Sequence, residues 1–449
     1  MRVVMLGWEF PPFIAGGLGV ACYGLTRALD RMGHDILFIL PRPVDRSQAS
    51  HITLLSPDET GRLVVSRPKA ERGFGPRITT GEFKHVVFRG VEASFTSPYP
   101  GFVAPPLSIT PSDPIARLAG EYAEEDAASA TIAPPPMSAS VAHYSGDLIG
   151  DAERYARLVV ALARRERFDV IHAHDWLTYP AGIALARASN RPLVVHVHST
   201  EFDRSGERVN QRLYDIERRG MHAASRVVAV SEFTKSICVK RYAVPEERID
   251  VVYNGIDREA DQPAPGAQIE SRDRIVLFLG RITMQKGPEY FISAAKRVLE
   301  KVENVKFVIA GSGDMTTRMI ELAAQMGIGH KVLFTGFLRG RDVERVFRMA
   351  DCYVMPSVSE PFGIAALEAI HHDVPVIISK QSGVSEVLTH VLKVDFWDTD
   401  EMANKIVAVL RHPPLSQTLR HHGPFQLRWL TWDGAAEKCV KAYAKAIQG

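Results

Sequence analysis

Arg281 and Lys286 are the two cations of this sequence whose spacing best suits the binding of a diphosphate. Arg281 follows the apolar run IVLFLG, and Lys286 comes five residues later, just before a helical pattern. A guanidinium binds phosphate oxygens bidentately and an ammonium acts as a point charge, so the pair predicts a compact diphosphate clamp. A solvated surface loop is the alternative interpretation of the same spacing.

Two carboxylates in the string SEPFGIAALE (359–368) give the sharpest chemical signal. The string follows the apolar run CYVMPS, and Pro361 and Gly363 predict that a helix begins there. On a helix, Glu360 and Glu368 would lie roughly 12 Å apart along the axis, which suits hydroxyl groups at two ends of an elongated ligand. An ordinary helix with a first-turn acid and a surface glutamate is the alternative. The amides of the first turn can meet a phosphate; they belong to Gly363, Ile364 and Ala365.

Glycines also follow the first apolar run of the chain. Gly16 and Gly17 stand in the string AGGLG, directly before a helical pattern. Glycine lets a backbone approach a ligand closely, and a helix N-terminus favours negative charge. A tight strand-to-helix turn explains the same residues, and their spacing does not match a dinucleotide fingerprint.

Histidines alternate along two apolar runs in the first half of the chain: His172, His174, His196 and His198. Each pair points to one face of its predicted strand, so a metal site is conceivable. No carboxylate or cysteine completes a ligand set, which favours packed or cleft-lining histidines. Asp398 and Asp400 form an Asp-any-Asp motif directly before a helical run, and helix capping explains them better than metal binding. We therefore expect no cofactor and no obligatory metal.

The composition is that of an ordinary globular protein. The chain has 449 residues, of which 46 % are apolar and 24 % charged, and its formal net charge is +2. This balance gives no electrostatic footprint for nucleic acid. The four cysteines lie far apart in the sequence, which argues against a zinc knuckle or a disulfide framework. No apolar run reaches the length of a membrane span, and the N-terminus lacks the apolar core of a signal peptide, so we expect a cytoplasmic protein without integral membrane association.

Short apolar runs alternate with helical patterns almost throughout the chain. Runs that are apolar on both faces, such as PLVVHVHS, predict strands of parallel sheets covered by helices. The Pro-rich, charged segment 258–273 interrupts the alternation and indicates a linker. The sequence thus predicts an α/β protein with two doubly wound, Rossmann-like domains, 1–257 and 274–449, that face a cleft. The last helical pattern, 432–447, can pack on either domain, and 96–140 is a Pro-, Ala- and Ser-rich loop insertion.

Taken together, these strings resemble the GT-B-fold, retaining, nucleotide-sugar glycosyltransferases, and within them the relatives of glycogen and starch synthases. The matching strings are GWEFPPFIAGGLG, HAHDWLT, HVHST, VSEFTK, YNGID, GRITMQKG and SEPFGIAALEA. They run through both predicted domains. The resemblance implies an N-terminal domain on the acceptor side and a C-terminal domain that binds the nucleotide-sugar donor.

The resemblance also implies roles on the donor side. Arg281 and Lys286 would hold the donor diphosphate, with Gly17 beneath it. Glu368 would bind the ribose hydroxyls, and Glu360 would bind hydroxyls of the transferred sugar. The backbone amides that would contact phosphate or sugar are those of Gly363, Ile364 and Ala365.

Two further roles concern the N-terminal domain. The resemblance implies that His198 contacts the transferred hexose near its anomeric centre and that Asp175 lines the acceptor side of the cleft. The catalytic set it implies is His198, Arg281, Lys286 and Glu360.

The expected reaction is transfer of glucose from ADP- or UDP-glucose to an α-glucan with retention of configuration. Ile14 stands where bacterial glycogen synthases usually carry lysine, and QSGVSEV resembles the sucrose-synthase-like branch, so donor nucleotide and acceptor stay open. The alternatives are a small-acceptor transferase (sucrose- or trehalose-synthase-like), a GT-B sugar-nucleotide epimerase and a non-catalytic glucan-binding protein. The intact cations and carboxylates of the site argue against the last. Between Ser94 and Gly150 the only basic side chains are Arg117 and His143, which favours a neutral glucan over a phosphorylated acceptor.

Overall fold

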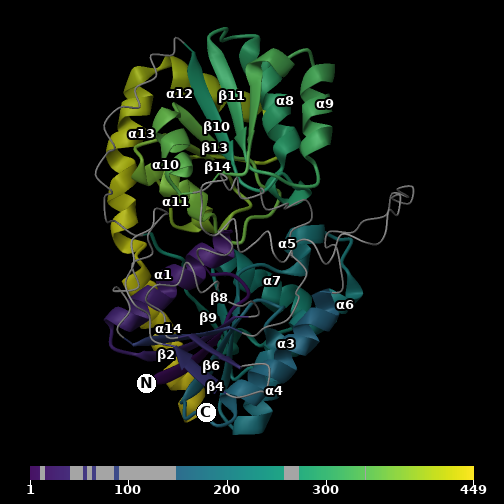
Figure 1. Ribbon diagram of the computed structural model, residues 1–449. Helices are drawn as coiled ribbons and strands as arrows, with labels where there is room; N and C mark the ends of the chain where they lie inside the picture. The colour runs from purple at the N-terminus through teal and green to yellow at the C-terminus, as the bar shows by residue number, and fades with distance from the viewer. Residues whose placement is uncertain are drawn as a thin grey trace, which may run out of the picture.

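The chain folds into two parallel sheets, one above the other in Figure 1, each covered by helices. The computed structural model describes residues 1–10, 16–40, 54–57, 63–66, 85–90, 148–256, 273–338 and 340–449. The expected loop insertion at 96–140 lies outside these residues, as does 258–272 of the expected linker. The prediction of two doubly wound, Rossmann-like units is confirmed.

The first sheet has seven strands in the order β5-β2-β1-β6-β7-β8-β9, and all its pairings are parallel. Its strands are β1 (Arg2–Leu6), β2 (Asp35–Leu40), β5 (Val86–Gly90), β6 (Val170–His174), β7 (Leu193–Val197), β8 (Arg226–Ala229) and β9 (Ile249–Val251). A separate antiparallel pair consists of β3 (Leu54–Pro57) and β4 (Leu63–Ser66). Consecutive residues of β1 are fully buried, which explains why the central strands are apolar on both faces.

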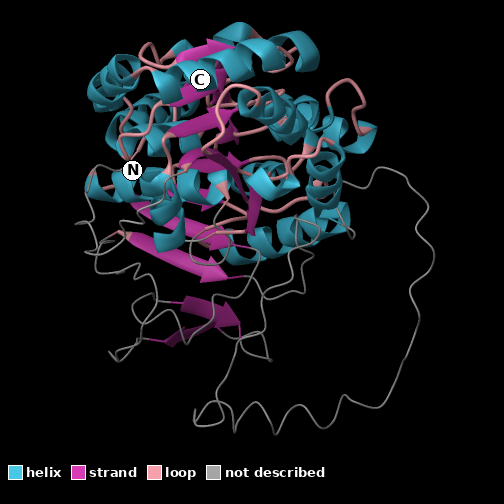
Figure 2. Cartoon of the chain, turned by 90° about the horizontal axis from the view of Figure 1, so that it is seen from above, coloured by secondary structure: helices cyan, strands magenta, loops and turns pink. Residues whose placement is uncertain are grey.

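Helices cover both faces of this sheet, as Figure 2 shows from above. On one face lie α3 (Leu148–Ala163) and α4 (Tyr179–Ser189), which pack on one alternate set of strand residues. On the other face lie α1 (Gly17–Arg31) and α14 (Trp432–Gln448). The remaining helices of this domain are α5 (Glu201–Ser205), α6 (Gln211–Ala223), α7 (Glu232–Tyr242) and the short η2 (Glu246–Arg248).

The second sheet has six parallel strands in the order β12-β11-β10-β13-β14-β15. They are β10 (Arg274–Leu279), β11 (Val305–Ala310), β12 (Val332–Gly336), β13 (Cys352–Met355), β14 (Val376–Ser379) and β15 (Leu392–Val394). Its α-helices are α8 (Pro288–Leu299), α9 (Thr316–Gln325), α10 (Arg341–Met349), α11 (Ile364–His371), α12 (Thr399–Arg411) and α13 (Pro413–Gln426). The 3-10 turns are η3 (Met284–Lys286), η4 (Gly329–Lys331), η5 (Gly383–Glu386) and η6 (Leu427–Trp429).

After α13 the chain returns to the first domain, where α14 packs beside α1 (Figure 1). Gly24 of α1 makes this close approach possible, because a Cβ there would lie 2.2 Å from the Trp432 indole. Arg31 and Asp433 join the two helices by an ion pair of 2.7 Å. The C-terminal helix therefore ties the two domains together. Among the described helices, none is both long and apolar enough to cross a membrane.

Candidate active site between the two domains

A cavity of ≈ 630 Å³ lies between the domains, at the carboxyl ends of strands from both sheets. Open α/β sheets bind their ligands at this edge. The cavity brings together every residue that the sequence predicts for the site: Gly17, Asp175, His198, Arg281, Lys286, Glu360, Gly363, Ile364, Ala365 and Glu368.

Gly17 is the first residue of α1 and faces this cavity. A Cβ at Gly17 would meet no described atom within 4 Å. Packing against the described residues therefore does not require this glycine, in contrast to Gly24. The missing side chain leaves room at the positive end of a 15-residue helix.

The four histidines form a two-by-two array of stacked rings on β6 and in the segment that begins with β7, which we call the histidine array. Ring centroids lie 4.2 Å apart for His172 and His174 and 4.1 Å apart for His196 and His198. Nδ1 of His172 lies 2.6 Å from the Tyr443 hydroxyl of α14. Nδ1 of His174 lies 2.9 Å from Nε2 of His198. The array thus runs from the core at α14 to the cavity, which His174 and His198 line.

The histidine array is neutral at pH 7. Burial lowers the pKa of His172 and of His198 to about 3. Burial and the neighbouring histidines lower the pKa of His174 and His196 well below 6.5. The N-domain wall of the cavity therefore offers hydrogen bonds from these rings without positive charge.

Three members of the array, His172, His174 and His196, have nitrogen atoms within 4.8 Å of one another. Their ring planes differ by only 11–30°. A shared metal ion would have to lie near the plane of each ligating imidazole, which stacked rings do not allow. Both nitrogens of His172 also have partners, since Nε2 lies 3.2 Å from His196 Nδ1. The geometry fits packed, cleft-lining histidines better than a metal centre.

Asp175 joins the loops that follow β6 and β7. Its Oδ1 accepts hydrogen bonds from the backbone amides of His198 at 2.7 Å and Ser199 at 3.3 Å. Its φ of 58° places it in the left-handed region, which aspartate tolerates better than most residues. Burial raises the pKa of Asp175 to about 7, although the two amides and Arg204 oppose this shift. Asp175 therefore holds the His198 backbone in place as well as lining the cavity.

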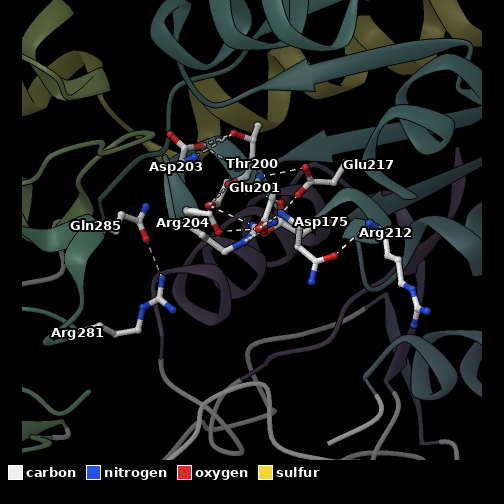
Figure 3. A network of polar contacts seen from close by, with 12 residues as sticks. Asp175, Thr200, Glu201, Asp203, Arg204, Arg212, Glu217, Arg281 and Gln285 are labelled. Carbon is white, nitrogen blue, oxygen red and sulfur yellow. Dashed lines mark hydrogen bonds and ion pairs between the residues drawn. The ribbon is translucent and has the colours of Figure 1, made fainter. Parts of the chain in front are cut away.

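The two predicted phosphate-binding cations lie on the C-domain wall. Arg281 follows β10, and its Nη2 donates to Gln285 Oε1 at 3.2 Å (Figure 3). Lys286 ends η3, and its Nζ lies 2.6 Å from Glu360 Oε2. Ser357 Oγ donates to the same carboxylate oxygen at 3.1 Å. Lys286 thus stands where it can contact a phosphate while it neutralises Glu360.

Glu360 lies outside a helix, contrary to the expectation from the sequence. It forms an isolated parallel bridge with Ser382, so its backbone is held beside the loop after β14. α11 begins only at Ile364, because Gly363 has a φ of 114° that a helix cannot accommodate. The separation of Glu360 and Glu368 therefore does not follow from the rise of one helix.

The start of α11 presents backbone amides to the cavity. The first helical bond runs from Ala366 N to Gly363 O at 3.1 Å. The amides of Ile364 and Ala365 precede that bond, and both residues line the cavity. They are therefore candidates for binding an anion.

Glu368 lies one turn further along α11 and lines the same cavity. Burial raises the pKa of its carboxyl to about 7. Burial raises the pKa of Tyr353 of β13, and the charges of Glu360 and Glu368 raise it further. Tyr353 lines the same cavity as these two carboxylates. No described group hydrogen-bonds to the Glu368 carboxylate or forms an ion pair with it, which leaves its oxygens available to hydroxyl donors.

Comparisons with known proteins agree with this architecture. Three family models match successive parts of the chain: the starch synthase catalytic domain at residues 2–96, glycosyltransferase family 4 at 120–260 and glycosyl transferases group 1 at 261–424. An uncharacterized glycosyltransferase of Methanocaldococcus jannaschii is 27 % identical, and the match covers 100 % of this chain and 99 % of that protein. A glycogen synthase of Mycobacterium tuberculosis is 24 % identical over 86 % of this chain and 80 % of that protein.

The chain is a GT-B-fold glycosyltransferase related to the glycogen synthases. Among solved structures, HepE of Anabaena in complex with UDP and glucose has the same fold, with a TM-score of 0.67 and 16 % identity. That match covers 99 % of each chain.

The cavity of this glycosyltransferase has further lining residues that sequence reasoning did not assign: Trp8, Glu9, Trp176, Arg204, Asn254, Gln285 and Phe337. Five of them lie inside the strings that carry the resemblance, and their position there could have marked them as site residues: Trp8, Glu9, Trp176, Asn254 and Gln285. Arg204 lies outside those strings, so no motif of the sequence marked it as a site residue. It forms ion pairs with Glu201, at 3.2 Å, and with Glu217, which is distant in the sequence.

Proposed function

We propose that this glycosyltransferase moves glucose from ADP-glucose or UDP-glucose to the end of an α-glucan with retention of configuration. One observation carries the proposal: a single cavity has Arg281, Lys286 and Glu360 on the C-domain wall and the neutral His198 on the N-domain wall. A nucleotide sugar has a charged diphosphate at one end and a neutral sugar at the other, so it suits a cavity with one charged wall and one neutral wall. The relation to a glycogen synthase and the fold shared with the UDP complex of HepE support the assignment.

On the C-domain wall, Arg281 and Lys286 would bind the donor diphosphate. The amides at the start of α11 would add contacts to phosphate or sugar, and Glu368 would accept hydrogen bonds from the ribose hydroxyls. Charge-assisted contacts of this kind are each worth about 1.5–3 kcal/mol. Because negative charge builds up on the leaving diphosphate, the same cations would stabilise the transition state more than the ground state.

Glu360 suits binding of sugar hydroxyls better than nucleophilic attack. Lys286 and Ser357 both engage its Oε2, which withdraws that oxygen from attack on carbon. The proposed reaction therefore proceeds by attack of the acceptor on the face from which the diphosphate leaves, with a leaving phosphate oxygen receiving the acceptor proton. The proposal includes no obligatory metal, because Arg281 and Lys286 supply the positive charge.

On the N-domain wall, the described residues favour a neutral acceptor. Arg204 is the only Lys or Arg that the described part of this wall contributes to the cavity, and the carboxylates of Glu201 and Glu217 already flank it. A sugar phosphate acceptor would need an additional cation to balance its charge. Trp8 and Trp176 also line the cavity, although each is only 3 % exposed.

The test is a panel of donors and acceptors with nucleotide release as the measurement. We expect release of ADP or UDP with maltooligosaccharides or glycogen and formation of an α-linked glucose product. Glucose 6-phosphate and fructose 6-phosphate should not act as acceptors. Efficient transfer to either sugar phosphate, with none to glucan, would show that the protein is a small-acceptor glycosyltransferase. Release of an epimerised nucleotide sugar without acceptor would identify an epimerase, and absence of donor turnover would favour a non-catalytic glucan-binding protein.

A further inference from the structure

The short helix α5 connects the two walls of the cavity. It begins directly after His198, Ser199 and Thr200, and it packs against η3, which carries Lys286. Asp203 of α5 accepts a hydrogen bond of 2.5 Å from the hydroxyl of Ser359. Ser359 is the residue before Glu360. One five-residue helix of the N-domain therefore touches two of the C-domain segments that bear proposed donor contacts.

Asp203 is fixed to the loop that carries His198 (Figure 3). Its Oδ2 accepts hydrogen bonds from the backbone amide and the hydroxyl of Thr200, both at 2.7 Å. The Thr200 hydroxyl in turn accepts from the Asp203 amide at 3.4 Å, which completes a capping box. Asp203 is 2 % exposed. A shift of its carboxylate would therefore move the His198 loop with it.

A buried network holds α5 from its other side. Arg204 forms ion pairs with Glu201 of α5 and Glu217 of α6 (Figure 3). The hydroxyl of Tyr242 donates to Glu217. Each of these three charged residues is at most 9 % exposed. Buried ion pairs contribute little net stability because desolvation offsets their attraction. Their effect here is to fix the orientation of α5 against α6.

The segment that carries Glu360 is also held on its other side by the N-domain. Ser231 Oγ donates to the carbonyl oxygen of Pro361 at 2.6 Å. The Glu386 carboxylate accepts hydrogen bonds from the first two amides of α7, at 2.6 and 3.0 Å. Hydrogen bonds from the opposite domain therefore flank Glu360 on both sides, at Ser359 and at Pro361.

We propose that Asp203 is a positioning residue for the transfer reaction: through Ser359 it fixes Glu360 relative to His198 across the cavity. This assignment rests on the proposed function for the roles of Glu360 and His198. Asp203 and Ser359 bind no substrate themselves. Loss of their contact therefore lowers the rate of transfer while binding of the nucleoside diphosphate, which is proposed to depend on Arg281, Lys286 and Glu368, stays the same.

The experiment compares Ser359→Ala, Asp203→Asn and the double variant with the control Ser236→Ala. Ser236 is also half-buried and also donates from its hydroxyl, at 2.8 Å to Phe233 O, but it lies in α7 outside the cavity. The measurements are kcat and KM for the donor, Kd for ADP and UDP, and amide hydrogen exchange of the segment 359–363 without ligand. We expect Ser359→Ala to lower kcat by at least about tenfold, to leave Kd within about twofold and to speed exchange of this segment.

The double variant separates positioning from folding. If Asp203 acts through Ser359, Ser359→Ala lowers kcat by a smaller factor in the Asp203→Asn background than in the wild type, because Asp203→Asn already weakens the contact that Ser359→Ala removes. If the loss of kcat in the double variant equals the product of the losses in the two single variants, the proposal is contradicted. A wild-type kcat or unchanged hydrogen exchange in Ser359→Ala would also contradict it. Faster exchange in Ser359→Ala combined with no donor turnover by the wild type would refute the proposed function while leaving the contact between the two walls established.

Discussion

Replacement of Glu368 by glutamine should stabilise the protein at pH 8 and weaken its binding of nucleoside diphosphate. Burial in the cavity wall raises the pKa of this carboxyl from an ordinary value of 4.5 to about 7. The folded state therefore binds more protons than the unfolded state between these two pH values, and its stability falls as the pH rises through this interval. Glutamine has the same shape and no proton to lose, so Glu368→Gln removes that decrease.

The size of the effect follows from the pKa. A rise from 4.5 to about 7 corresponds to roughly 3 kcal/mol for a fully desolvated group. Because the side chain is only half-buried, solvent screening reduces this to about 1–2 kcal/mol. For a domain of this size we expect a Tm increase of about 2–6 °C at pH 8 and none at pH 5. The loss of charged hydrogen bonds to ribose should weaken ADP or UDP binding by about 10- to 100-fold.

Thermal melts at pH 5 and pH 8, with calorimetric titrations of ADP and UDP, measure both effects. Glu300→Gln is the matched control, since Glu300 is exposed at the end of α8. Glu360→Ala gives the contrast in binding, because a residue that contacts only the sugar should leave nucleoside diphosphate affinity unchanged. Equal stabilisation by Glu368→Gln at both pH values would refute the electrostatic reasoning. Equal losses of nucleoside diphosphate affinity in Glu368→Gln and Glu360→Ala would show that the two roles are wrongly divided.

Two further predictions concern the phosphate site. Arg281→Ala and Lys286→Ala should each lower kcat by about 100-fold or more, and wild-type kinetics at saturating donor in both variants would exclude the diphosphate clamp. Only Lys286→Ala should also lower the Tm, because it leaves the Glu360 carboxylate, which is 7 % exposed, without its ammonium partner. Gly17→Ala should raise the Tm slightly, since alanine is favoured over glycine in a helix by about 1 kcal/mol and its Cβ meets no described atom within 4 Å. The same variant should raise the donor KM, and an unchanged KM would place the donor away from α1.

The sequence predicted the fold and the edge of each sheet that carries the site, because both depend on local patterns. Apolar runs bounded by helical patterns specify buried parallel strands, and ligand-binding residues of such sheets follow the strands. Arg281 after β10 and Asp175 after β6 are therefore found where the sequence places them. Asp398 is a similar case, since its side chain accepts the Glu401 amide at 2.8 Å and caps α12 as its position before a helical run predicts.

Features that depend on contacts between distant segments were not predictable in this way. The pair of Asp203 and Ser359 joins residues 156 positions apart, and no local pattern marks the contact between them. The start of α11 was predicted too early for a related reason. Ser231, from the opposite domain, donates to the carbonyl oxygen of Pro361, and Gly363 adopts a φ of 114°, so the helix does not begin before Ile364.

The electrostatic difference between the two walls suggests how the proposed reaction keeps one orientation of the donor. The described C-domain wall carries Arg281, Lys286 and the amides of α11, whereas burial keeps the histidine array of the opposite wall uncharged. Both side-chain cations that are proposed to bind the diphosphate therefore lie on the same wall of the cavity. With the diphosphate on that wall, the hexose would point toward His198, which can hydrogen-bond to it without attracting the leaving group. Because Asp175 fixes the His198 backbone and Asp203 connects the same loop to Ser359, the neutral wall is attached to the charged one by hydrogen bonds. The orientation of the donor would thus follow from the positive charge of the C-domain wall. The distance between the sugar and the acceptor would follow from the hydrogen bonds between the two domains.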